Sequence, residues 1–218
     1  MWTQADCRTL YGTILVISVS FGSCKGRDYA QAIRGMISSF YNLYESHRYL
    51  MEGEKLDAED KAVYQRMKKA LEMGDETKAE SAIPRLCRLL YRYYGIWPVI
   101  LLDEYDTPLL EAYTDGYWEE MIGTCRQLFH AAFKENAYYS RAIITGVTRV
   151  TKNSLFSDLN NIEVDTVTCD AYSDCFGFTE EEVIDALQCQ NVQEFSKVKA
   201  MYDGFIFGSQ KDIYNPWS

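Results

Sequence analysis

The sequence predicts an α/β fold in which a parallel sheet carries helices on its flanks. Short runs rich in β-branched residues recur along the chain, and segments with apolar residues at helical spacing separate them. Strands that alternate with helices of this length are typical of a parallel sheet.

Four strands are expected, at residues 13–21, 98–102, 141–147 and 162–167. The first is rich in valine and isoleucine and stops at Gly22. Because such runs occur where helices cover both faces of a sheet, we expect this strand to be buried on both faces.

Apolar residues at every third or fourth position indicate the helices between these strands. Asp28 is a suitable N-cap for the first helix, and Gly74 and Gly95 are suitable terminators for the next two. A loop is expected directly after the 98–102 strand. The expected helices cover residues 29–47, 56–73, 77–94 and 117–134, and Pro84 marks a kink or a late start in the third of them.

The pattern changes to helices after Cys169. Thr179 and Glu182 form a capping box that opens a helix to about residue 188, and a shorter helix covers 192–202. We therefore expect a core over residues 1–169 and a small helical segment over residues 170–218.

The chain is acidic, with a formal charge of −10 and a pI near 4.8. No cluster of lysine and arginine offsets this charge in any one segment. Nucleic-acid binding depends mainly on basic side chains that neutralise phosphates, so direct nucleic-acid binding is not expected. A local basic groove remains an open alternative.

Cysteine usage and hydropathy favour a cytoplasmic protein with no membrane segment. The seven cysteines are widely spaced and form no C-x-x-C pair, which is typical of buried thiols in a reducing compartment. The apolar run at 13–21 is too short to span a bilayer, and it lacks the flanks of a signal peptide.

Two adjacent acids follow the expected strand at 98–102. Asp103 and Glu104 come directly after four apolar residues. Open α/β sheets bind ligands at the carboxyl ends of their strands, where Asp103 can hold a magnesium ion and Glu104 can orient a water. Strand alternation would point the two side chains in opposite directions. Acids at a strand end also arise by chance, and that interpretation stays open.

The next expected strand carries a second pair of candidates. Thr145 lies at its end and Arg149 follows four residues later. Thr145 is a candidate for sensing a γ-phosphate. Arg149 can hold a phosphate bidentately or form a structural ion pair with Asp106.

Five stretches in this order resemble the AAA-ATPase-like family of prokaryotic and some anaerobic fungal proteins. They are VILLDEYDTP at 99–108, ITGVTR at 144–149, SLFSDLNNI at 154–162, FGFTEEEV at 176–183, and YDGF at 202–205 together with IYNPWS at 213–218. The resemblance extends from about residue 10 to the end of the chain.

The resemblance implies a P-loop NTPase fold of the additional-glutamate type with a small helical lid, ATP and Mg²⁺ as ligands, and Asp103 and Glu104 as a Walker B element. Relatives often carry a further nuclease-like domain of the PD-(D/E)xK type.

This chain departs from the family pattern at the phosphate-binding loop. It contains no G-x-x-x-x-G-K-[ST] stretch, and the nearest imitation, Gly22 to Gly26, has Lys25 in the wrong place and no hydroxyl residue after it. We expect that Met1 begins inside the domain and that the first, central strand is missing. The absence of that first strand leaves a gap beside the 141–147 strand, which carries Thr145, or lets the 162–167 strand close against the 141–147 strand. The end at residue 218 likewise precedes any nuclease domain.

The sequence therefore supports two hypotheses for the function of this chain. The first is an incomplete AAA-ATPase-like domain that binds ATP weakly or not at all in this form, because the lysine and the backbone cradle are absent. The alternative is a non-catalytic interaction or regulatory module on a degenerate ATPase scaffold, with the acidic helices of 52–80 as the partner surface. Nuclease activity of the chain itself is disfavoured, because no Asp and Glu-x-Lys arrangement is visible at strand spacing.

Overall fold

The computed structural model describes residues 9, 11–148, 155–156, 159 and 162–215. The chain divides into two compact units, Met1–Asn160 and Asn161–Ser218, which are described separately below. The expected boundary at 169/170 falls inside the second unit.

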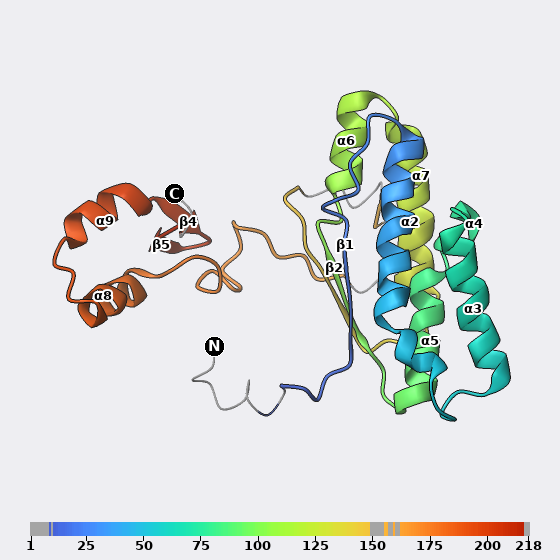
Figure 1. The fold of residues 1–218 in the computed structure, drawn as a ribbon. Coiled ribbons are helices and arrows are strands. Elements are labelled where there is room, and N and C mark those ends of the chain that lie inside the picture. Colours follow the sequence, from blue (N-terminus) through green and yellow to red (C-terminus); the bar gives the residue numbers. More distant parts are fainter. Residues whose placement is uncertain (1–8, 10, 149–154, 157–158, 160–161, 216–218) are drawn as a thin grey trace. The chain divides into compact units, whose positions relative to one another are not determined.

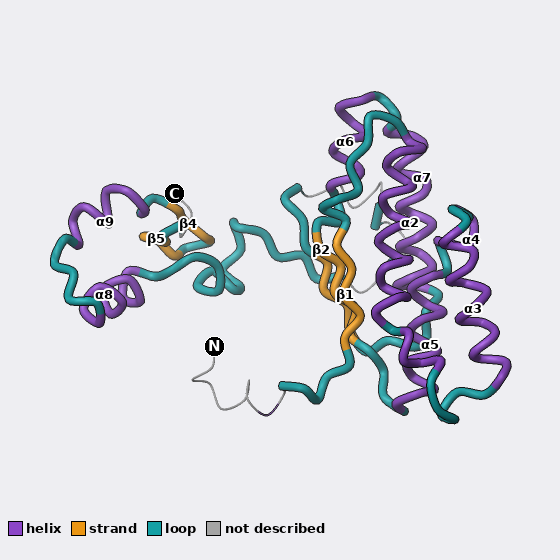
Figure 2. Tube along the Cα trace, in the orientation of Figure 1, coloured by secondary structure: helices purple, strands orange, loops and turns teal. Residues whose placement is uncertain are grey.

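The first unit contains a parallel sheet of three described strands, shown in Figure 1 and, by secondary structure, in Figure 2. The strands β1 (Val16–Ser20), β2 (Val99–Asp103) and β3 (Arg141–Ile144) lie in the order β1-β2-β3. Val16 pairs with Val99, and Val99 pairs with Arg141 on the other side. The α/β class, the parallel sheet and three of the four expected strands are thus confirmed, with β1 and β3 shorter than expected and β2 shifted by one residue.

Within the described residues of this unit, the helices cover one face of the sheet, which corrects the expectation that the first strand is buried on both faces. Ile17, Val19 and Ile100 are buried, whereas Val16 and Ile143 are exposed at 38% and 56%. Figure 1 shows α2 and α7 lying along the same side of β1 and β2. The sequence of β1 alternates serine with isoleucine and valine, and this period-2 pattern describes a strand with one buried face.

Six α-helices of this unit have the following bounds: α2 Tyr29–Ser46, α3 Ala58–Glu72, α4 Glu76–Ala79, α5 Ala82–Tyr94, α6 Thr107–Asp115 and α7 Trp118–Phe129. A 3₁₀ turn at Arg48–Met51 and a π-helical turn at His130–Lys134 continue two of them. The Asp28 side chain caps α2, and Gly95 ends α5 in the left-handed conformation. The helix expected at 77–94 is two helices, because Pro84 fits the first turn of α5 and cannot continue α4.

The helix α6 replaces the loop expected after β2. Asp106 is its N-cap, Pro108 lies in its first turn, and Gly116 ends it in the left-handed conformation. Proline at the first helical positions and glycine just past the last one are typical helix boundaries. These signals were present in the sequence, and α6 positions the residues that follow Asp103.

The second unit contains both helices and strands. The helices α8 (Glu180–Cys189) and α9 (Phe195–Tyr202) are followed by an antiparallel hairpin of β4 (Phe205–Phe207) and β5 (Gln210–Ile213). The capping box of Thr179 and Glu182 is confirmed. Lys199 on α9 forms ion pairs with α8 and β5, since its Nζ lies 2.5 Å from Glu180 Oε1 and 3.4 Å from Asp212 Oδ1.

Two expectations for this region are wrong. Residues 162–167 form no strand, and the segment after 170 is not purely helical. Val164 and Val167 are exposed, so no packing of their side chains stabilises a strand at this place. The closure of a 162–167 strand against β3 is therefore also wrong, and β3 pairs only with β2 among the described strands.

The described cysteines differ in burial, and Cys169 is half-buried. Cys24, Cys87 and Cys125 are buried, whereas Cys175 and Cys189 are exposed, so the expectation of buried thiols holds for only part of the set. Burial raises the pKa of the Cys125 thiol to about 12. Among the described helices, none combines the length and the apolar character that a membrane span requires.

The one-sided sheet predicts a difference between two neighbouring residues of β2. Ile100 is fully buried under the helices, whereas Leu101 is half-buried on the other face. In this chain, Ile100→Ala should lower the free energy of unfolding by about 3 kcal/mol, and Leu101→Ala by about 1 kcal/mol or less. Urea denaturation followed by circular dichroism measures both. Equal losses would show that the second face is also covered.

Candidate functional site

The candidate site lies at the carboxyl edge of the sheet, where β2 and β3 end. Asp103 is the last residue of β2 and is exposed, and Thr145 directly follows β3. The Thr145 hydroxyl donates a hydrogen bond of 2.5 Å to Asp103 Oδ1. The parallel register therefore brings together two residues that are 42 positions apart in the sequence.

Glu104 departs from strand geometry. Its φ of +51° places it in the left-handed region, which is sparsely populated for residues with a side chain. The simple alternation expected for Asp103 and Glu104 therefore stops at Asp103. The Glu104 carboxylate accepts a hydrogen bond of 3.1 Å from Thr107 Oγ1, and it lies against Gly22 at the end of β1.

The turn between β2 and α6 holds the segment that follows β3. Tyr105 N donates to Thr145 O at 3.1 Å, and Tyr105 Oη donates to Thr148 O at 2.8 Å. Asp106 Oδ2 accepts from Thr148 N at 2.5 Å and from Thr148 Oγ1 at 2.7 Å. Four hydrogen bonds thus fix residues 145–148 beside Asp103.

Asp106 is 1% exposed, and its second oxygen, Oδ1, has no hydrogen-bond partner among the described residues. A Cβ on Gly146 would lie 2.6 Å from that oxygen, so only glycine fits there. The sequence suggested Arg149 as a partner of Asp106 or of a phosphate, and Arg149 lies outside the described residues. Within them, Thr148 is the partner of Asp106.

The loop from Gly22 to Gly26 is not built as a phosphate cradle. Gly22 N donates to Ser20 Oγ, Cys24 N donates to Phe21 O, and Arg27 N just beyond the loop donates to Gln31 Oε1. Phosphate-binding loops direct such N–H groups at the ligand. Three donors at this turn already have protein partners, which argues against its use for phosphate.

The donor set at the sheet edge fits magnesium only together with a nucleotide. Asp103 supplies an exposed carboxylate and Thr145 a hydroxyl oxygen, and Mg²⁺ prefers oxygen ligands. Among the residues that the structure describes, no group of three or more His, Cys, Asp or Glu can hold a metal by itself. One carboxylate with phosphate oxygens and water is the usual arrangement for Mg²⁺ in such sites.

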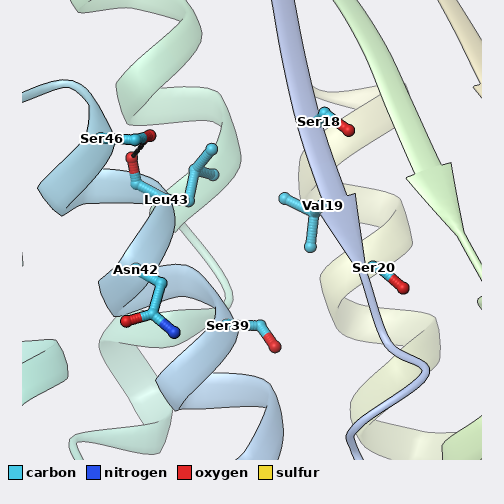
Figure 3. A pocket seen from close by; sticks show the side chains of 7 residues that line it. All are labelled: Ser18, Val19, Ser20, Ser39, Asn42, Leu43 and Ser46. Atoms are coloured by element: carbon cyan, nitrogen blue, oxygen red, sulfur yellow. Dashed lines mark hydrogen bonds between the residues drawn. The ribbon is translucent and has the colours of Figure 1, made fainter.

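An open pocket of about 290 Å³ lies elsewhere, between β1 and α2 (Figure 3). Small polar side chains make up most of its wall. It is lined by Ser18, Val19, Ser20, Ser39, Asn42, Leu43 and Ser46. None of the candidate site residues contributes to it, so this pocket does not mark the site at the strand ends.

The hydrogen bonds of Asp106 predict a stabilising role that an exposed acid on the same helix lacks. Asp106→Ala leaves the N–H and the hydroxyl of Thr148 without their acceptor and should lower the free energy of unfolding by about 2 kcal/mol. Asp115→Ala, at the exposed end of α6, is the control and should change it by less than about 0.5 kcal/mol. Thermal denaturation measures both, and similar effects of the two changes would contradict this role.

Comparisons with known proteins connect this geometry to a family. The chain is 32% identical over 123 residues to an "Uncharacterized protein in vnfD 5'region" from Azotobacter chroococcum mcd 1. That match covers 55% of this chain and 23% of the relative, so the chain spans less than a quarter of that protein's length. No solved structure matches the chain significantly.

A family model described as "Predicted AAA-ATPase" matches residues 6–156, more than half of the chain. The match includes Asp103, Glu104, Thr145 and Arg149, and it ends before the capping box of α8. The chain therefore belongs to the AAA-ATPase-like family.

Proposed function

We propose that this chain provides the magnesium-binding and water-orienting half of an ATP-hydrolysing site, a Walker B element in a P-loop NTPase domain. One observation carries the proposal: Asp103 and Glu104 are exposed together at the carboxyl end of the central strand, with Thr145 hydrogen-bonded to Asp103. Ligands of open α/β sheets bind at this edge. Family membership supports ATP as the ligand.

The proposed roles follow from the chemistry of each side chain. The Asp103 carboxylate holds magnesium, and the Thr145 hydroxyl orients that carboxylate and registers the γ-phosphate. Glu104 accepts a hydrogen bond from the attacking water, which directs the water's lone pair at phosphorus. When bound with the nucleotide, Mg²⁺ neutralises charge on the phosphate oxygens. Arg149 remains a candidate phosphate ligand on sequence grounds alone.

The phosphate-binding loop must come from outside these 218 residues, because they contain no G-x-x-x-x-G-K-[ST] stretch. Among the described strands, β3 pairs on one side only. A further strand beside β3 would bring a phosphate loop next to Thr145, as the family's strand order implies. We propose that ATP binding needs such a strand, and that the domain works in the cytoplasm, controlling an attached effector such as a nuclease-like domain or a protein partner.

The absence of that loop from the sequence also favours a second candidate, a non-catalytic interaction module. Its proposed partner surface is the acidic stretch of residues 52–80. One acid of this stretch is structural, because Asp60 is 3% exposed and accepts a hydrogen bond of 2.6 Å from Arg92 Nη1. Exposed acids, among them Glu54, Glu59 and Glu72, would have to form that surface.

The 218-residue chain alone should bind a fluorescent ATP analogue only at millimolar concentrations or not at all. The lysine and the backbone N–H groups that supply most of the phosphate affinity are absent from it. Fluorescence anisotropy in the presence of Mg²⁺ measures the dissociation constant. Micromolar binding that Asp103→Ala abolishes would contradict this expectation.

In the natural full-length protein, Glu104→Gln should separate binding from hydrolysis. The amide keeps the shape of the side chain but is a poor acceptor of the water's proton, so kcat should fall by about a hundredfold or more. Binding of ATP should change little. Asp115→Asn, on the exposed end of α6, is the matched control. Full ATPase activity in Glu104→Gln, or no ATPase activity in the unaltered protein, would favour the interaction module.

A further inference from the structure

Thr107 binds Glu104 through both its main chain and its side chain. Thr107 N donates to Glu104 O at 3.1 Å, and Thr107 Oγ1 donates to Glu104 Oε2 at 3.1 Å. Thr107 is the first residue of α6 and is 9% exposed, so its own position is fixed by the helix. The exposed acid is therefore held by a buried neighbour.

Gly22 also lies against the carboxylate of Glu104. A Cβ on Gly22 would lie 2.7–2.8 Å from both oxygens and the carboxyl carbon of Glu104, a distance that real Cβ atoms do not adopt. The backbone of Gly22 is not in the left-handed region, so a side chain there is acceptable to the backbone and would instead displace the Glu104 carboxylate. The carboxylate of Glu104 thus lies between the end of β1 and the start of α6.

A purely structural role does not account for this arrangement. The first turn of α6 is closed by main-chain bonds from Leu109 N and Leu110 N to Asp106 O, without the Glu104 carboxylate. Glu104 has no ion pair among the described residues, and the Thr107 hydroxyl is the donor that they supply to its carboxylate. Its left-handed backbone keeps the side chain at this place against the usual preference.

We propose that Thr107 is a positioning residue for Glu104. The Thr107 hydroxyl donates its hydrogen bond to Oε2 and holds the carboxylate against Gly22. Oε1 is then the acceptor for the attacking water. This inference rests on the proposed function, in which Glu104 orients that water. Misplacement of an orienting group by about 1 Å is enough to slow a reaction strongly.

Steady-state ATPase kinetics of the natural full-length protein test this role. Thr107→Val removes the hydroxyl at nearly constant volume and should lower kcat about tenfold, because a hydrogen bond to a charged group is lost. The KM for ATP should stay within about twofold, since the phosphate contacts are untouched. Thr107→Ser should restore most of kcat. Thr114→Val is the control and should not affect kcat, since among the described residues that hydroxyl on the same helix donates to Leu110 O.

Gly22→Ala provides a second variant that leaves Thr107 intact. Its methyl group displaces the Glu104 carboxylate, so kcat should again fall about tenfold with little change in KM. If both Thr107→Val and Gly22→Ala keep the kcat of the unaltered protein, the proposal is overturned. A fall in kcat for Thr107→Val that Thr107→Ser does not reverse would also overturn it.

A spectroscopic measurement tests whether Thr107 positions Glu104 even where no ATPase activity is found. A lack of ATPase activity would contradict the proposed function but not the positioning of Glu104 by Thr107. In ¹³C-labelled protein, Thr107→Val should shift the carboxyl resonance of Glu104 and the amide resonance of Gly22, and Thr107→Ser should return both toward their original positions. Unchanged resonances in Thr107→Val would show that the hydroxyl does not hold the carboxylate.

Discussion

The pairing of β2 on both of its sides determines where the described candidate site residues lie. In the described sheet, β2 is the central strand and its neighbours run parallel to it. Parallel strands bring their carboxyl ends to one edge, so Gly22 after β1, Asp103 at the end of β2 and Thr145 after β3 meet there. The register of the strands therefore determines which side chains meet at this edge, whatever their chemistry.

The turn after β2 converts this register into a fixed geometry. Residues 103–106 contact two other segments: Thr145 and Thr148 after β3 bond to Asp103 and Asp106, and Gly22 after β1 contacts Glu104. Asp106 is buried and therefore needs partners, which the main chain and hydroxyl of Thr148 supply for one oxygen. Asp106 is thus the buried carboxylate that holds the turn to the segment after β3, whereas the carboxylates of Asp103 and Glu104 are exposed.

Much of the sheet, and the position of Asp103 and Thr145 at the ends of two of its strands, could be predicted from the sequence. Both rest on local signals, namely apolar runs that end in polar residues and the rule that parallel strands end at one edge. The strand expected at 162–167 was wrong because β propensity without a packing partner does not make a strand. The roles of Gly22, Thr107 and Thr148 depend on contacts between residues far apart in the chain or on a turn conformation, which periodicity does not encode. Helix α6 is different, since Asp106, Pro108 and Gly116 together marked its bounds.

Electrostatics explains why the proposed role of this edge is only half of an ATPase site. It presents the carboxylates of Asp103 and Glu104 to solvent, and neither forms an ion pair with a described residue. The polyphosphate of ATP is itself strongly negative, and like charges in contact within a protein repel by about 4 kcal/mol at 4 Å for an effective dielectric constant near 20. A nucleotide can approach these two acids only with a divalent cation between them and with positive or N–H groups on its other side. The cation fits the oxygens of Asp103 and Thr145, whereas the second requirement is the task of a Gly-Lys-Ser loop, which these 218 residues do not contain. The same charge pattern that supports the proposed Walker B role therefore leads us to expect that ATP affinity depends on a separate phosphate-binding segment.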